Sequence, residues 1–150
     1  MRYWEDFPVG MEAEHGSVEV TEDEILRFAR EFDPQPFHVD PEAAAAGPFG
    51  GLIASGWHTA SLYMGLFVRS QLETSAGMGS PGLEELRWLV PVRPGDVLTA
   101  RSRIAEAWPS ETKPGRGTLV GEHEFVNQRG EVVMRFRART LMARRPPAGG

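Results

Sequence analysis

The fold of this chain is decided by the stretch Gly56-Trp57-His58-Thr59-Ala60-Ser61-Leu62-Tyr63-Met64-Gly65-Leu66-Phe67-Val68. On a helix, its apolar side chains would fall on nearly every side, and polar residues return only over 69–73. A helix that is apolar all round is a buried helix. Over residues 56–72 it would be about 25 Å long. A chain of 150 residues can bury such a rod only if its other elements wrap around it.

Segments with the pattern of strands lie on both sides of this helix. Those segments are 12–20, 86–92, 98–108, 119–125 and 132–142. Turn sequences at 93–96 and 127–130 separate successive strands. Antiparallel strands with one apolar face, curled around one buried helix, define a hot-dog fold. We therefore predict a single α+β hot-dog domain over residues 1–150, in which about 145–150, rich in Pro and Gly, form a frayed tail.

The composition is that of an ordinary globular protein, with 41% apolar and 25% charged residues. A formal charge of −5 argues against nucleic acid as a partner, because binding phosphates requires a net basic face. The absence of cysteine excludes disulfides, thiolate metal sites and thiol nucleophiles. No uncharged apolar run reaches the roughly 18–20 residues that a membrane span requires. We expect a soluble, cytoplasmic protein with no membrane partner.

An acid and a histidine lie five positions apart in Phe32-Asp33-Pro34-Gln35-Pro36-Phe37-His38-Val39-Asp40-Pro41. A helix that begins with a capping box of Thr21 and Glu24 is predicted to end at Asp33, because a proline follows. The prolines then favour extended backbone rather than a helix. On such a stiff segment, Asp33 and His38 can converge on one water molecule as a general acid–base pair. The alternative is a surface loop in which Asp33 caps a turn and His38 is incidental.

Gly56 opens the buried helix, where amide N–H groups have no partner within the helix. Its amide is a candidate donor to a developing oxyanion, although a tight turn into the helix is by itself the simpler explanation of the glycine. His58 is interpreted as a structural or rim histidine rather than a catalytic one. His38 and Asp40 form a His-x-Asp pair, but no third ligand at a recognisable spacing accompanies them, so we expect no metal.

With these features in this order, the chain resembles the MaoC-like hydratase/dehydratase family, which includes (R)-specific enoyl-CoA hydratases. The resemblance extends from about Trp4 to Ala143. Four blocks carry it: Asp6-Phe7-Pro8-Val9-Gly10, Asp33-x-x-Pro36-x-His38-x-Asp40-Pro41, Phe49-Gly50-Gly51-Leu52-Ile53-Ala54-Ser55-Gly56 and Pro91-Val92-Arg93-Pro94-Gly95-Asp96. Three positions differ from the family pattern: Phe32 replaces a glycine, Gln35 an asparagine, and Met64 stands where some members have a serine.

The resemblance implies syn hydration of a trans-2-enoyl-CoA thioester, or the reverse dehydration of a 3-hydroxyacyl-CoA, in fatty acid metabolism. Asp33 and His38 would hold the reacting water and exchange protons with it and with the α-carbon. The Gly56 amide would bind the thioester oxygen, and Gln35, Ser55 and His58 are possible supporting residues. No metal or redox cofactor is implied, because coenzyme A enters as part of the substrate.

Two other functions stay open: a hot-dog acyl-CoA thioesterase, in which an acid activates water against the thioester carbonyl, and an acyl-CoA-binding module without turnover. Family members usually pair, so the resemblance implies a homodimer or higher homo-oligomer with the site between subunits. Arg135, Arg137 and Arg139 share one face of the last strand. They are interpreted as its solvated side, and the alternative is that one of them contacts a substrate phosphate.

Overall fold

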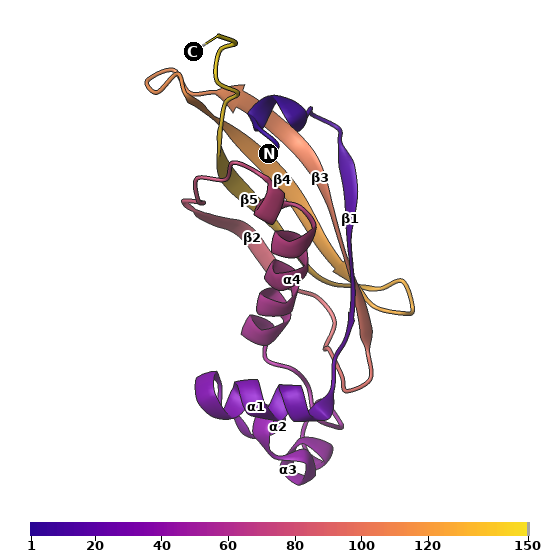
Figure 1. Ribbon diagram of the computed structural model, residues 1–150. Helices are drawn as coiled ribbons and strands as arrows, with labels where there is room; N and C mark the ends of the chain where they lie inside the picture. Colours follow the sequence, from indigo (N-terminus) through magenta and orange to yellow (C-terminus); the bar gives the residue numbers. More distant parts are fainter. Residues whose placement is uncertain (150) are drawn as a thin grey trace.

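The computed structural model describes residues 1–149, which form a five-stranded antiparallel sheet with a long helix along one face (Figure 1). The strands are β1 (Glu12–Glu19), β2 (Gly82–Trp88), β3 (Val97–Pro109), β4 (Arg116–Val126) and β5 (Val132–Ala143). They follow the order β1-β3-β4-β5-β2 across the sheet. The helices are α1 (Glu22–Phe32), α2 (Pro36–Val39), α3 (Pro41–Ala46) and α4 (Gly56–Ser70), with short 3-10 turns at η1 (Trp4–Asp6) and η2 (Leu72–Thr74). The predicted α+β hot-dog architecture is confirmed.

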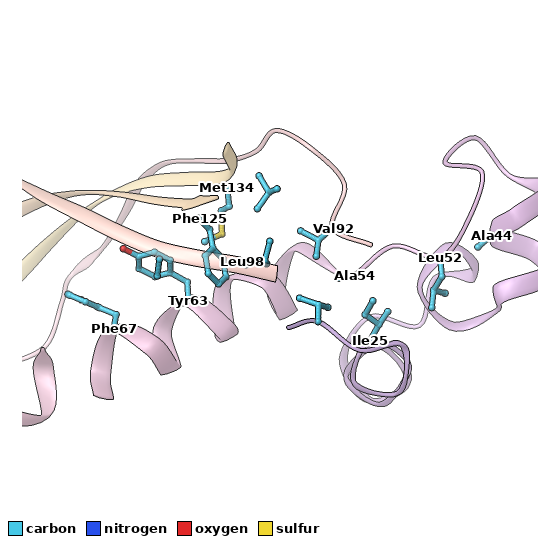
Figure 2. Close-up of a cluster of buried hydrophobic side chains, with 13 residues drawn as sticks. Ile25, Ala44, Leu52, Ala54, Tyr63, Phe67, Val92, Leu98, Phe125 and Met134 are labelled. Carbon is cyan, nitrogen blue, oxygen red and sulfur yellow. The ribbon is translucent and has the colours of Figure 1, made fainter. Parts of the chain in front are cut away.

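The main core lies between α4 and the sheet. Tyr63 extends from α4 toward Phe125 of the strands, and Phe67 follows one turn later on the same helix (Figure 2). The ring of Tyr63 meets that of Phe125 edge to face, with centroids 5.4 Å apart. Such aromatic contacts bury large apolar areas and also fix the geometry of the pair. The 3.6-residue spacing of the inward side chains therefore sets how α4 sits on the sheet.

The expectation that α4 is buried on all sides is wrong for this chain by itself. Trp57 and Met64 are 58% and 48% exposed, and Val68 is exposed as well. The sheet lies on one side of α4 only (Figure 1), and nothing else within residues 1–149 covers the opposite side. The sequence pattern indicates that a helix face is apolar, but it does not indicate whether the same chain or a second molecule covers that face.

β2 begins and ends earlier than predicted, because Val90 and Val92 belong to the connection that follows it. Val92 lies in the core, and its carbonyl accepts a hydrogen bond from the amide of Ala54 at 2.8 Å. β2 is itself irregular: Glu85 has a φ of 54°, and the pairing with β5 shifts in register between Glu84 and Arg87. The alternating pattern over 86–92 reflects side-chain burial. Residues 90 and 92 still pack in or against the core, although the pairing of β2 with β5 ends at Trp88.

The segment after Asp33 contains two short helices, α2 and α3, where extended backbone was predicted. Pro36 and Pro41 each occupy the first turn of one of them, where a missing N–H has no cost. The side chain of Asp40 caps α3 by accepting hydrogen bonds from the amides of Glu42 and Ala43, both at 3.1 Å. These helices and α1 gather at the end of the molecule where α4 begins (Figure 1).

The start of α1 is confirmed, but the predicted capping box is only half formed. The Thr21 hydroxyl accepts a hydrogen bond from the amide of Glu24 at 3.3 Å. The carboxylate of Glu24 does not return this bond, because its Oε2 is buried and has no hydrogen-bond partner. At the other end of the chain, Arg144 and Arg145 bond the carboxylates of η1. The predicted tail also includes Gly150, which lies outside the described residues.

Candidate active site

Asp33 is held at the C-terminal end of α1 by bonds to both its backbone and its side chain. Its amide donates to the carbonyl of Ala29 at 2.9 Å, which fixes it as the cap of the helix. The side chain of Gln35 donates to Oδ1 at 2.8 Å, and the hydroxyl of Ser55 donates to Oδ2 at 2.7 Å. Two helices thus meet at this carboxylate, because Ser55 is the residue that caps α4.

His38 lies on α2 and is buried, with its ring directed at Asp33. Nδ1 is 2.7 Å from the carbonyl oxygen of Ile53. A carbonyl oxygen only accepts hydrogen bonds, so Nδ1 carries the proton of the neutral ring. In that neutral form Nε2 is an acceptor, and it lies 3.3 Å from Oδ2 of Asp33. The backbone of the segment leading into α4 therefore sets the tautomer of His38.

The environment of Asp33 favours its ionised form. Partial burial opposes ionisation, but the hydrogen bonds from Gln35 and Ser55 hold the pKa of Asp33 below its ordinary value, and a positive charge on His38 lowers it further when that ring is protonated. A carboxylate and an unprotonated imidazole nitrogen are both acceptors, so they cannot bond to each other. They can instead accept both hydrogens of one water molecule. The pair is thus suited to binding water and taking a proton from it.

Gly56 and His38 line the same cleft, which has a volume of about 360 Å³. Gly56 is the first residue of α4, where backbone amides lack partners within the helix and the helix dipole favours negative charge. The indole of Trp88 packs directly on Gly56: a Cβ added there would lie 2.4 Å from the ring. The rest of the cleft is mainly apolar, with Ile53, Val90 and Val133 among its walls.

The structure brings together four of the residues singled out from the sequence, namely Asp33, Gln35, His38 and Ser55. Gly56 follows Ser55 directly and lines the adjoining cleft. His58 lies apart from this group, buried on α4, and its ring stacks on that of Phe28 in α1. The proximity of the four is observed, whereas their catalytic and supporting roles stay predictions.

Three contributors to the site were not found from the sequence. The carbonyl of Ile53 orients His38, but a backbone atom leaves no signal in residue identity. Trp88 covers Gly56 from a different part of the chain, and its place within the alternating run 86–92 resembles that of any aromatic residue of a strand. Thr59, one turn into α4, also lines the cleft; it was passed over because it lies in the stretch 56–68, which was interpreted as the buried core helix.

The sheet face opposite α4 carries a network of paired charges. Arg137 bonds Glu106 and Glu122, and Arg139 lies 3.5 Å from Glu84. This arrangement supports the interpretation of the arginine row as a solvated face. Among residues 1–149, no three His, Cys, Asp or Glu side chains are grouped as metal ligands would be. Over the same residues, no helix combines the length and apolar character needed to cross a bilayer.

The five-stranded sheet with α4 along one face defines a hot-dog protein, and the acid–histidine pair lies beside the start of that helix. The chain belongs to the MaoC-like family, because the family model described as "MaoC like domain" matches residues 6–122. A crystal structure of a MaoC-like dehydratase from Rhodospirillum rubrum superposes with a TM-score of 0.92 and 43% identity, covering 98% of this chain and 100% of that one.

Two curated proteins are also similar to this chain in sequence. The uncharacterised protein YdeM of Bacillus subtilis is 32% identical over 116 residues, which are 77% of this chain and 82% of that protein. The 3-hydroxyacyl-thioester dehydratase Z of Mycobacterium tuberculosis is 40% identical over 91 residues, 58% of this chain and 59% of that protein. The family assignment is thus consistent with hydration or dehydration of acyl thioesters.

Proposed function

We propose that this protein adds water to a 2-enoyl-CoA thioester or removes it from the corresponding 3-hydroxyacyl-CoA. The observation that carries the proposal is the 3.3 Å approach of His38 Nε2 to Asp33 Oδ2 beside the cleft lined by Gly56. Two acceptors directed at one point suit the binding of a water molecule. The dehydratase relative, which is named for a hydroxyacyl thioester, supports the same substrate class.

In the hydration direction, the water oxygen forms a bond to C3 of the enoyl group as one of its protons passes to the Asp33–His38 pair. The pair delivers a proton to C2, so that H and OH are added across the double bond. Because acid and base lie together on one side of the substrate, the addition is syn. The amide of Gly56 donates to the thioester oxygen, on which enolate charge develops. This sequence uses no metal or redox cofactor, and coenzyme A arrives with the substrate.

Gln35 and Ser55 support the reaction by fixing both oxygens of Asp33, and the apolar walls of the cleft hold the acyl chain. An apolar cleft with few polar groups is the usual form of a small-molecule site. A fixed carboxylate matters because proton transfer requires hydrogen-bond distances in the transition state.

The test is hydration of crotonyl-CoA and of longer or branched enoyl-CoA thioesters, followed by loss of the conjugated chromophore. Asp33→Asn and His38→Ala are each expected to lower the rate by a factor of about 10²–10⁴. The exposed Asp23→Asn on α1 provides a matched control and should retain full turnover. Wild-type rates in both site variants would refute the assignment. Release of free thiol would instead show a thioesterase, and tight binding without turnover a binding module.

We also propose that the protein acts as a homodimer in the cytoplasm. The exposed face of α4, with Trp57, Met64 and Val68, is more apolar than a monomer surface requires. It continues onto β2, because the rings of Trp57 and Trp88 are in contact at 5.2 Å. β2 lies at the edge of the sheet and has a free row of backbone donors and acceptors. A second copy can cover both features at once.

A further inference from the structure

The partly buried Glu24 and the buried His58 are two polar side chains that the proposed mechanism leaves without a role. Within residues 1–149, Oε2 of Glu24 and Nδ1 of His58 are the only buried side-chain nitrogen or oxygen atoms without a hydrogen-bond partner. Native proteins rarely leave such atoms unpaired, because the lost solvation is not recovered. Two of them in one small interface require an explanation.

Both atoms belong to the contact between α1 and α4. Glu24 and Phe28 are one helical turn apart and share a face of α1. The ring of Phe28 stacks on His58 of α4, with centroids 4.9 Å apart and planes inclined by 10°. Glu24 thus lies on the face of α1 that meets His58, which explains why its carboxylate does not return to the helix start.

The charges around His58 are consistent with this arrangement. Burial lowers the pKa of His58, the negative charge of Glu24 raises it, and the nearby Arg27 lowers it. The net direction is downward, so the ring is neutral near pH 7 and carries one N–H. An ionised carboxylate only accepts hydrogen bonds. The donor that Glu24 lacks is therefore the one that a neutral His58 can supply.

We propose that Glu24 and His58 are linked through one buried water molecule: Nδ1–H of His58 donates to the water, and the water donates to Oε2 of Glu24. This link ties α1 to α4. Asp33 caps the far end of α1, and Ser55, which bonds Asp33, caps α4 one turn before His58. Glu24 and His58 are thus positioning residues that fix the carboxylate of Asp33 relative to the cleft.

Histidine ring NMR tests the link without any activity measurement. A two-bond ¹H–¹⁵N correlation of the full-length protein identifies which ring nitrogen is protonated, and the spectrum of His58→Phe assigns the signals of His58. We expect a slowly exchanging proton on Nδ1 of His58. In Glu24→Gln, which keeps size and an acceptor oxygen, this proton should shift upfield, and in Glu24→Leu it should lose its protection. A wild-type ring protonated on Nε2 would overturn the proposal.

The kinetic test rests on the proposed function. His58→Phe keeps the stacking on Phe28 but removes Nδ1. It and Glu24→Leu should each lower kcat about tenfold or more with KM unchanged, because small displacements of a catalytic group are costly. The double variant should lose no more than either single one. His58→Asn, which offers an amide N–H near the same place, should recover most of kcat.

The matched control is Glu22→Leu, the same change on the exposed side of α1, which should leave kcat and the ring proton unaltered. Independent, multiplicative losses in the double variant would show that the two residues do not act together. If the wild type hydrates no enoyl-CoA but shows the protected Nδ1 proton, the proposed function fails and the Glu24–His58 link stands.

Discussion

Asp33 depends on neighbours that come from two different helices. Gln35 lies on its own segment, only two residues away, whereas Ser55 belongs to the start of α4. Both donate hydrogen bonds to the carboxylate, and such bonds stabilise its charged form. Because proton transfer requires the correct ionisation state as well as the correct distance, each donor influences the pH at which the site operates.

Replacing Ser55 by Ala should move the acid limb of the pH–rate profile to higher pH. The hydroxyl of Ser55 lowers the pKa of Asp33, so its loss raises that pKa and a higher pH is needed to ionise the carboxylate. The profile of kcat/KM for an enoyl-CoA measures this shift. Ser61→Ala removes an exposed hydroxyl of the same helix and should leave the profile in place. An unmoved acid limb in Ser55→Ala would contradict the prediction.

Gly56→Ala should destabilise the protein by about 1–3 kcal/mol, because the new Cβ would lie 2.4 Å from the ring of Trp88 and the indole must move. Without that contact, alanine would be favoured over glycine in a helix. Urea unfolding measures the change. Trp88→Ala should cost less in the Gly56→Ala background than in the wild type, because it removes the clash. Additive losses would show that the two residues do not interact.

At the scale of elements, α4 is joined to the sheet by a buried polar network as well as by apolar packing. The hydroxyl of Tyr63 lies 3.0 Å from the carbonyl of Arg101 and 2.7 Å from Nδ1 of His123. His15 on β1 contacts Ser70 at the end of α4 and Ser102 on β3, the latter at 2.7 Å. Burial raises the pKa of Tyr63 and lowers the pKa of His123 to about 3, so both remain neutral.

This network predicts that the fold loses stability in mild acid. The unfolded chain binds a proton at His123 with a pKa near 6.5, whereas the folded protein does so only at about 3. Stability is therefore fully present above pH 6.5 and declines as the pH falls toward 3, by at most about 1.4 kcal/mol per pH unit for this group. Urea unfolding at several pH values should show a shallower decline for His123→Phe. Equal slopes for the two proteins would exclude His123 as the cause.

At the scale of the whole molecule, the outer face of α4 and the edge of β2 remain uncovered in a single chain. Buried aromatic residues hold the inner face of α4, while Trp57, Met64 and Val68 lie on the outside. A protein that exposes an apolar helix face next to a free strand edge is prone to association. Closed two-fold pairing satisfies both surfaces without leading to open-ended assembly.

Sedimentation equilibrium should therefore give twice the chain mass of 16.6 kDa. Met64→Lys places a charge in the middle of the outer face of α4 and should shift the protein toward monomer. Val97→Lys changes an exposed residue at the start of β3 and serves as the control, with no effect on mass. A wild-type protein that remains monomeric at micromolar concentration would contradict the homodimer.

The sequence by itself determined the elements and the candidate pair. The 3.6-residue and two-residue periods located α4 and four of the strands, and Pro34 marked the end of α1. The predictions for the segment after Asp33 and for the bounds of β2 were wrong, because each sequence pattern is compatible with two local structures. Proline disfavours the middle of a helix but suits its first turn, so the segment holding His38 became α2. Alternation over 86–92 marked burial as well as a strand, so β2 ended at Trp88.

Only the tertiary structure decided how these parts meet. The Nδ1 proton of His38 is set by the carbonyl of Ile53, the carboxylate of Asp33 by a hydroxyl from the start of α4, and the cover of Gly56 by a tryptophan from β2. Hydrophobic periodicity indicates which face of a helix or strand is buried, because burial favours an apolar side chain at each buried position. It does not record partners, because hydrogen bonds and contacts between distant segments depend on coordinates that no local pattern contains.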